Sequence, residues 1–277
     1  MGERVLDHLM QGLEALRYEP TGKRVRAWLG GVLAVDSTRA VLVWEPRRVV
    51  PSYAVPESDV GVEVVATGAV GAADDGGAGV RIPAVSDRSV LDPSIPFAVH
   101  TAEGEVVELR ADGDTALGLR LRDPDLPGYV ALDFSGFDQW RDEDEPLVAH
   151  PRDPFHRIDV LASSRHLRVE LDGALLAESR HPMLLFETAL PPRYYLPRDD
   201  VRVDLRPSER RTWCAYKGQA SYWSPVVDGH PLGDLAWSYE DPLHEAERVR
   251  RLVAFFDERV DVTVDGVRLP RPVTPWS

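Results

Sequence analysis

The chain has 277 residues, of which 43% are hydrophobic, and a formal net charge of -14 from 32 basic and 46 acidic side chains. This length suits one large domain or two ordinary ones, and the apolar fraction is that of a packed globular protein. The acidic excess argues against a nucleic-acid partner, because such proteins need a basic face to replace phosphate counterions. The single cysteine, Cys214, excludes an intramolecular disulfide and a cysteine-rich zinc site.

The sequence shows no sign of a membrane segment. No apolar run approaches the ~20 residues that span a bilayer, and the N-terminus lacks the uninterrupted apolar region of a signal peptide. We therefore expect a cytoplasmic protein, with monomer and homodimer both open. Within the N-terminal segment, residues 1–22, apolar side chains recur at helical spacing from Glu3 to Leu16. They predict an amphipathic helix that docks on the parent domain, since its polar face lacks the basic residues that favour lipid.

From Lys23 onward the pattern is that of short antiparallel strands. Two apolar runs flank Gly30-Gly31, which is typical of a two-residue hairpin turn. The passage then recurs later in the chain. Glu45 and Glu187 are 142 residues apart, and Tyr53 and Tyr194, further along, are 141 apart. A slip of one residue between two matching blocks is what a loop insertion produces, so we predict a tandem duplication.

The predicted repeats span residues 23–149 and 150–277. The first contains a glycine-rich stretch, residues 68–79, that lacks the spacing of a phosphate-binding loop and is interpreted as a surface loop. Apolar residues at helical spacing follow Pro242 in the second repeat, so we predict a helix there, and a shortened counterpart from Ser135 to Glu145 in the first. Each repeat is then a small β-rich domain with one helix.

Four motifs of the second repeat carry a family resemblance: HPRDPFHRIDVLASSRH, PPRYYLPRDDV, CAYKGQASYW and LAWSYEDP. With them, the segment from Asp153 to Pro272 resembles the DUF427 family, a bacterial domain of unknown function, in the tandem form of actinobacterial members. The first repeat fits only in its opening part. The resemblance implies a mainly β fold of the β-tent (Mss4-like) group and no established activity. Many proteins of that group hold zinc through paired cysteines, which this chain lacks, so we expect no metal and no cofactor.

The pair of Cys214 and Lys217 is the most suggestive catalytic candidate. A lysine near a cysteine can create a reactive thiolate, and a spacing of three suits a turn. The alternative is a buried cysteine that packs as a small hydrophobe, with Lys217 at the surface. A nucleophile also needs an oriented base, and the candidates His156, His166 and His181 have no fixed place in the sequence pattern. Both interpretations stay open.

Glu187 is a third catalytic candidate, because a half-buried carboxylate with a shifted pKa can act as a general acid or base. Its counterpart Glu45, however, belongs to the repeat that lacks the Cys-x-Tyr-Lys-Gly segment. This favours a shared structural role, such as accepting hydrogen bonds from the backbone or from Arg193. His156 belongs to the proline-rich segment that joins the repeats, whose spacing fits no zinc site, and we interpret that segment as an extended connector.

Aromatic residues concentrate in the second repeat and suggest a site for a small polar or aromatic ligand. The predicted cleft has aromatic walls and polar anchors, namely Tyr194, Tyr216, Tyr222, Trp223 and Trp237 with Arg193, Lys217 and Glu187. The same aromatics would equally suit a hydrophobic core. Two other functions remain open: an enzyme that uses Cys214 activated by Lys217, and a scaffold whose aromatic residues form a protein interface.

Overall fold

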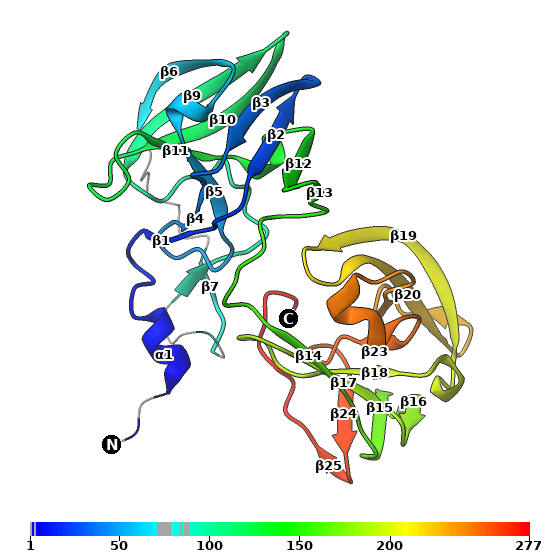
Figure 1. The fold of residues 1–277 in the computed structure, drawn as a ribbon. Helices are drawn as coiled ribbons and strands as arrows, with labels where there is room; N and C mark the ends of the chain where they lie inside the picture. The colour runs from blue at the N-terminus through cyan, green and yellow to red at the C-terminus, as the bar shows by residue number, and fades with distance from the viewer. Residues whose placement is uncertain (1, 3, 71–78, 84, 86–88) are drawn as a thin grey trace. The chain divides into compact units, whose positions relative to one another are not determined.

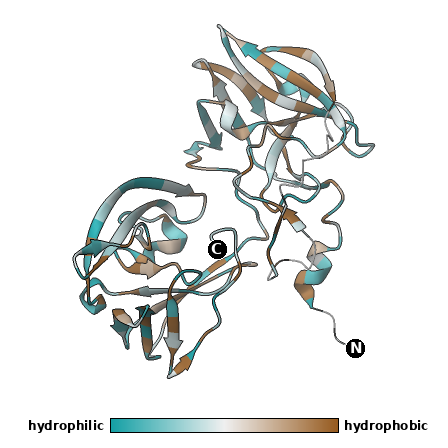
Figure 2. Cartoon of the chain, turned by 180° about the vertical axis from the view of Figure 1, so that it is seen from behind, coloured by the Kyte–Doolittle hydropathy of each residue, from teal (hydrophilic) through white to brown (hydrophobic). Residues whose placement is uncertain are grey.

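The structure is a computed structural model that describes residues 2, 4–70, 79–83, 85 and 89–277 (Figure 1). Most of the predicted glycine-rich loop lies outside these residues. Antiparallel strands make up nearly all of the regular structure, which confirms the mainly β fold expected from the sequence. Hydrophilic and hydrophobic residues alternate in bands along the long strands (Figure 2), because successive side chains of a strand point to opposite faces.

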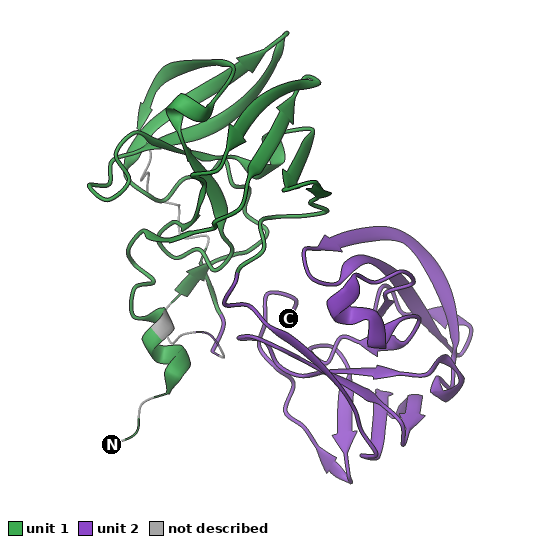
Figure 3. Cartoon of the chain, viewed as in Figure 1, with its two compact units in different colours: residues 1–81, 86–153 green, residues 82–85, 154–277 purple. Residues whose placement is uncertain are grey.

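The chain divides into two compact units (Figure 3). Unit 1 comprises residues 1–81 and 86–153, and unit 2 comprises residues 82–85 and 154–277. Each unit contains a large sheet and a four-stranded sheet with its own buried core. In the part of the chain that is described, the helices are too short and too polar for a membrane crossing.

The large sheet of unit 1 has the strand order β1-β4-β5-β11-β10-β9-β6. These strands are β1 (Arg17–Pro20), β4 (Val41–Trp44), β5 (Ser52–Pro56), β11 (Tyr129–Leu132), β10 (Asp114–Leu121), β9 (Gly104–Ala111) and β6 (Glu63–Val70). The small sheet has the order β13-β12-β2-β3. Its strands are β13 (Glu145–Pro146), β12 (Gln139–Asp142), β2 (Val25–Leu29) and β3 (Val32–Ser37). A separate hairpin joins β7 (Gly79–Arg81) to β8 (Ser89–Leu91).

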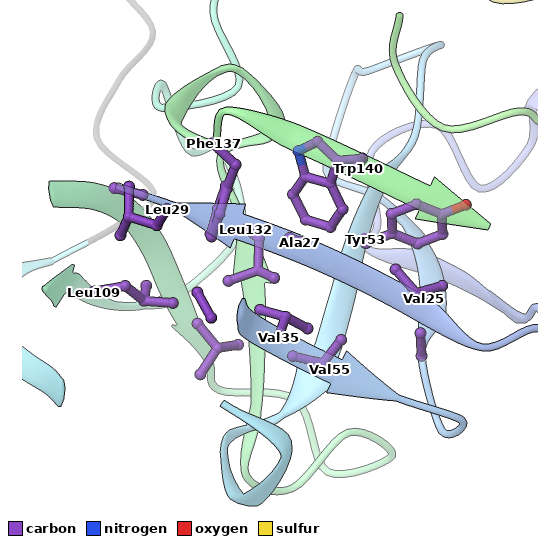
Figure 4. Close-up of a cluster of buried hydrophobic side chains, with 14 of the residues drawn as sticks. Val25, Ala27, Leu29, Val35, Tyr53, Val55, Leu109, Leu132, Phe137 and Trp140 are labelled. Carbon is purple, nitrogen blue, oxygen red and sulfur yellow. The ribbon is translucent and has the colours of Figure 1, made fainter. Parts of the chain in front are cut away.

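The core of unit 1 is built from alternate residues of both sheets (Figure 4). On β2, Val25, Ala27 and Leu29 are buried while the residues between them are only half-buried. Trp140 of β12 packs near Tyr53 of β5, with ring centroids 5.7 Å apart. The two-residue period of β2 therefore places one of its faces inside the unit, whereas β4 and β5 are buried on both faces.

The large sheet of unit 2 has the strand order β14-β17-β18-β23-β22-β20-β19, with β21 (His230–Pro231) paired to β20. Its strands are β14 (Ile158–Ala162), β17 (Met183–Glu187), β18 (Arg193–Leu196), β23 (Val253–Phe255), β22 (Ala236–Ser238), β20 (Gly218–Val227) and β19 (Asp204–Cys214). The small sheet has the order β16-β15-β24-β25. Its strands are β16 (Ala174–Ser179), β15 (Leu167–Leu171), β24 (Asp261–Val264) and β25 (Val267–Arg268).

The two units have corresponding strand orders. In the large sheets β1, β4, β5, β11, β10, β9 and β6 take the places of β14, β17, β18, β23, β22, β20 and β19. A short 3-10 helix follows the third strand in each, η1 (Glu57–Asp59) after β5 and η3 (Arg198–Asp200) after β18. The first hairpin of each small sheet shifts register at corresponding points, between Ala27 and Trp28 and between Val169 and Glu170.

The N-terminal helix is shorter than predicted. The predicted helix reaches Leu16, but α1 covers only Val5–Met10. Leu13 is fully buried, and its carbonyl oxygen accepts a hydrogen bond of 2.6 Å from the backbone N–H of Arg47. The chain is thus tied to the body of unit 1 directly after the helix, and β1 then pairs with β4.

The helices predicted within the repeats are also mostly absent from the described residues. After Pro242 the chain forms only the 3-10 helix η4 (His244–Val249) and then continues into β23. The segment predicted as the shortened helix of the first repeat forms η2 (Phe134–Gly136), β12 and β13. In β12 the burial alternates with a period of two, so pairing with β2 overrides the local helical pattern.

Candidate functional site

The two faces of the large sheet in unit 2 separate the residues predicted to form one cleft. Tyr195 of β18 packs in the same buried cluster as Tyr222 of β20 and Trp237 of β22. Tyr194 and Trp223 are their immediate neighbours along the strands and pack against the other core cluster of the unit. Side chains alternate across a strand, so these two residues lie on the opposite face. The prediction that all the aromatic residues wall one cleft is therefore wrong for Tyr194 and Trp223.

Glu187, the last residue of β17, lies on the same face as Leu185 and Tyr195, because side chains alternate along the strand. One carboxylate oxygen, Oε2, accepts a hydrogen bond from Nζ of Lys217, which lies in the turn between β19 and β20. The other, Oε1, is 2.9 Å from Nε2 of His156, which precedes β14. The side chains of Glu187 and Lys217 are 7% and 11% exposed, whereas that of His156 is 21% exposed. A buried ion pair therefore has a histidine at its rim.

Each charge of the ion pair stabilises the ionised form of the other residue. Burial alone would raise the pKa of Glu187, but the positive charge of Lys217 and the hydrogen bond with His156 lower it to about 2. Burial alone would lower the pKa of Lys217, but Glu187 raises it above the ordinary value. Both groups are therefore ionised at neutral pH. Neither is suited to exchange protons there, so the prediction of Glu187 as a general acid or base lacks a physical basis.

One tyrosine packs against His156, and others lie in the buried cluster of the same face. The ring of Tyr216 stacks on His156 with centroids 4.4 Å apart. The hydroxyl oxygen of Tyr195 accepts a hydrogen bond of 3.1 Å from Nε1 of Trp237, and burial raises the pKa of Tyr195 to about 12. Tyr239 lies beside it, with ring centroids 6.5 Å apart, and burial raises its pKa as well. We call Glu187, Lys217, His156, Tyr195 and Tyr239 the Glu187 cluster.

Cys214 lies at the edge of this cluster. It is the last residue of β19, pairs with Gly218 of β20 and is partly buried. Lys217 lies in the turn that directly follows Cys214, and the thiol contributes to the raised pKa of the lysine. The alternative interpretation, with Lys217 at the protein surface, is wrong, because the lysine is enclosed in its ion pair with Glu187.

Arg193 lies on the same face of the large sheet but forms its ion pairs with residues other than Glu187. Its guanidinium donates from Nη1 to Glu258 at 2.9 Å, lies 3.7 Å from Asp257, and sits 5.6 Å from the rings of both Trp237 and Trp276. Burial raises the pKa of Asp257 to about 7. Among the described residues, Arg193 makes no hydrogen bond with Glu187, so the structural role predicted for that pair is wrong.

The three histidines considered as bases have different environments. Only His156 contacts Glu187. His166 lies 2.8 Å from Oε1 of Glu178 at the small sheet, and the backbone N–H of His181 donates to Ser179. Within the described ranges, no group of three or more histidine, cysteine, aspartate or glutamate side chains is placed to hold a metal ion.

Unit 1 holds the counterpart carboxylate in a different environment. Glu45, at the turn after β4, is buried and lies 2.8 Å from Nδ1 of His100. Its other oxygen accepts hydrogen bonds from the backbone N–H groups of Thr101 and Ala102, at 2.6 and 2.9 Å. Both carboxylates thus have a histidine partner, but the histidines come from segments that do not correspond in the two strand orders.

The sequence prediction left Tyr195 and Tyr239 out of the cleft and named His156 only as a possible base, without its partner. Tyr195 follows Tyr194 directly, and the alternation of β18 decides which of the two faces Glu187. Tyr239 stands two residues after Trp237, so the same alternation places it on that face. The partnership of His156 with Glu187 follows from the register of β14 against β17, where Ile158 lies opposite Glu187. The first two have a local sequence signal, but the third does not.

One comparison with known proteins matches part of unit 2. Residues 159–266 match the model of a family described as a domain of unknown function (DUF427). No curated protein matches the chain. The matched segment contains Glu187, Lys217, Tyr195, Tyr239 and Cys214, and it confirms the resemblance of the second repeat. The description of the family names no activity.

Proposed function

We propose that unit 2 binds a small polar molecule at the Glu187 cluster. The observation that carries this proposal is a buried ion pair with a rim open to solvent: the Glu187 side chain is 7% exposed and that of His156 is 21% exposed. Burying charges costs several kcal/mol per ion, and shifted pKa values are typical of functional sites. A ligand would approach from the His156 side.

The aromatic residues on this face supply the wall of the proposed site. Of the predicted set, Tyr216, Tyr222 and Trp237 lie on this face, and Tyr195 and Tyr239 join them. Aromatic rings bury large apolar areas, while hydroxyl groups orient a ligand through hydrogen bonds. The proposed site thus differs from the predicted cleft: it leaves out Tyr194, Trp223 and Arg193 and adds Tyr195, Tyr239 and His156.

A matched pair of histidine variants tests the proposal. A fragment library of small polar molecules is screened by ligand-observed NMR against the full chain, His156→Gln and His166→Gln. Both histidines bond a glutamate through Nε2, at 2.9 and 2.8 Å, but only His156 belongs to the cluster. We expect fragments whose binding weakens in His156→Gln and persists in His166→Gln. A screen without hits, or hits that respond equally to both variants, would refute the proposal.

One observation favours a second candidate function, an enzyme with Cys214 as nucleophile. The thiol contributes to the raised pKa of Lys217, and His156, whose ring stacks on Tyr216 two residues after the cysteine, is held by the Glu187 carboxylate. A thiol, a histidine and an orienting carboxylate are the parts of an activated nucleophile. We rank it second because the positive charge of Lys217 is already paired with Glu187.

The scaffold hypothesis has less support. An interface needs aromatic side chains at the surface, where they dominate binding energy. Tyr216, Tyr222 and Trp237 are at most 8% exposed. Their rings pack inside unit 2, so these three residues offer little aromatic area for a partner protein to contact.

We also infer that the chain arose by tandem duplication, with repeats over residues 23–149 and 150–277. The corresponding strand orders and the register shifts at corresponding hairpin positions support this inference. The retention of a buried glutamate, Glu45 and Glu187, at the ends of the corresponding strands β4 and β17 supports it further. In this interpretation the first repeat kept the acid but not its lysine.

A further inference from the structure

The hydrogen bonds of Glu187 determine which nitrogen of His156 carries a proton. The ring nitrogen Nε2 lies 2.9 Å from Oε1 of Glu187, while Nζ of Lys217 donates to the other carboxylate oxygen. The carboxylate is ionised at neutral pH, and an ionised carboxylate can only accept hydrogen bonds. Nε2 therefore carries the hydrogen of this contact. In a neutral imidazole the remaining nitrogen, Nδ1, is then an acceptor.

The acceptor nitrogen Nδ1 of His156 is accessible from solvent. It makes no hydrogen bond to any described residue, because the hydrogen bond of this ring joins Nε2 to Glu187. It is also not one of the fully buried side-chain nitrogens that lack a partner among the described residues. The His156 side chain is 21% exposed. Solvent therefore reaches Nδ1, and a ligand group can contact this nitrogen from the same side.

The ring of His156 is also held in one position. Tyr216 stacks on it, with ring centroids 4.4 Å apart and the planes inclined by 26°. The next residue, Arg157, accepts a hydrogen bond of 3.0 Å from the backbone N–H of Thr188, and its own N–H donates to the Thr188 hydroxyl at 2.8 Å. Thr188 directly follows Glu187, so the backbone segments that carry the histidine and the carboxylate are joined. Nδ1 is thus an acceptor whose place is set before a ligand binds, which lowers the cost of binding.

We propose that the ligand of the Glu187 cluster presents a hydrogen-bond donor, an O–H or N–H group, to Nδ1 of His156. The proposal rests on the function proposed above and specifies its ligand class. A group that only accepts hydrogen bonds, such as an ether oxygen, would leave Nδ1 without a partner and displace the water that now satisfies it. The opposite charges of Glu187 and Lys217 offset each other, so an uncharged donor suits the site.

The protonation of the ring can be measured without a ligand. NMR spectra of the imidazole nitrogens distinguish a protonated ring nitrogen from an unprotonated one. For the full chain at neutral pH we expect Nε2 of His156 to be protonated and Nδ1 to be unprotonated. A proton on Nδ1 under these conditions would overturn the proposal, because the nitrogen would then be a donor.

Phenol with anisole, and aniline with N,N-dimethylaniline, are suitable probe pairs, because methylation removes the donor and keeps the ring. Dissociation constants are measured by NMR titration of the full chain at neutral pH, where all four probes are uncharged. We expect phenol, aniline or both to bind, roughly 2- to 10-fold more tightly than the methylated partner, which is the usual effect of one hydrogen bond. Binding of phenol alone would identify a hydroxyl as the ligand group, and binding of aniline alone would identify an N–H group. A methylated probe that binds as tightly as its parent, or the failure of both donors to bind, would overturn the proposal.

His156→Gln tests whether Nδ1 is the acceptor, with His166→Gln as its control. The amide N–H of glutamine can replace Nε2–H towards Glu187, but the variant has no acceptor in the place of Nδ1. The preference for the unmethylated probe should therefore disappear in His156→Gln and persist in His166→Gln, whose histidine contacts Glu178 instead. A preference that persists in both variants would overturn the assignment. Fragments that depend on His156 but carry no donor would show that the site exists and that only its ligand class is wrong.

Discussion

Replacing Lys217 with methionine tests the energetics of the buried ion pair most directly. In the folded chain the pKa of Glu187 is lowered from 4.5 to about 2. Each pKa unit corresponds to about 1.4 kcal/mol, so the ionised carboxylate contributes about 3 kcal/mol to the free energy of unfolding. Because the folded pKa is lowered, this contribution is present above pH 4.5 and is lost as the pH falls through 2.

In Lys217→Met the burial of Glu187 is no longer offset by the lysine charge, so the pKa of the carboxyl group rises. The sign of its contribution then reverses: stability is retained at low pH and lost as the pH rises through the new pKa. We therefore expect Lys217→Met to be destabilised by at least about 3 kcal/mol at pH 7. The difference from the wild type should become smaller towards pH 4.

Amide hydrogen exchange measures the loss of stability in Lys217→Met at individual strands. Amide protection in β17 and β20 should fall by more than about 100-fold at pH 7, while protection in β4 and β5 of unit 1 serves as the internal control. Arg168→Met, which removes an exposed ion pair with Glu170 at 2.9 Å, should change protection little. Adding Glu187→Gln to Lys217→Met should restore part of the loss. The reasoning fails if Lys217→Met behaves like Arg168→Met, or if its effect is the same at pH 4 and pH 7.

Two further predictions concern the alternatives that the structure keeps open. Cys214→Ser should leave fragment binding within about twofold, because a hydroxyl replaces the thiol at the edge of the cluster with little change in shape. NMR titration checks this, and complete loss of binding would favour the enzyme hypothesis. Residues 150–277 expressed alone should fold, because both sheets of unit 2 come from this part of the chain. Dispersed amide signals would show it, whereas collapsed signals would contradict the predicted repeat boundary.

The strands and hairpins of the fold are readable from the sequence because their signals are local. Gly30-Gly31 marks a turn between two alternating runs, and β2 and β3 form the hairpin expected there. The prediction of helices within the repeats was wrong, because apolar spacing alone does not show what the side chains pack against. Trp140 lies in a segment predicted as helix, but its indole belongs to the core of a sheet sandwich. The long-range pairing of β12 with β2 has no signature in the segment itself.

The candidate site was predicted in composition but not in arrangement. Lys217 was recognised through Cys214, its neighbour in sequence, whereas its ion-pair partner is Glu187, 30 residues away. That partnership depends on the turn between β19 and β20 reaching the end of β17, which is a property of the whole sheet. Choosing between Tyr194 and Tyr195 likewise required knowing which face of β18 the ion pair occupies. Residue types reveal what a site can contain, and strand register determines which of them meet.

The contrast between the two buried glutamates indicates where a ligand should be sought. Glu45 takes two of its hydrogen bonds from backbone N–H groups, which have no further protons to offer, and the side chain of its histidine partner is only 3% exposed. Among the described residues Glu187 is bound only by side chains, and Lys217 brings two N–H donors that the carboxylate does not use. Its histidine partner is 21% exposed. The hydrogen bonds of Glu45 with the backbone stabilise unit 1. Glu187 instead holds a lysine that has unused N–H donors near solvent, and a ligand can accept hydrogen bonds from them.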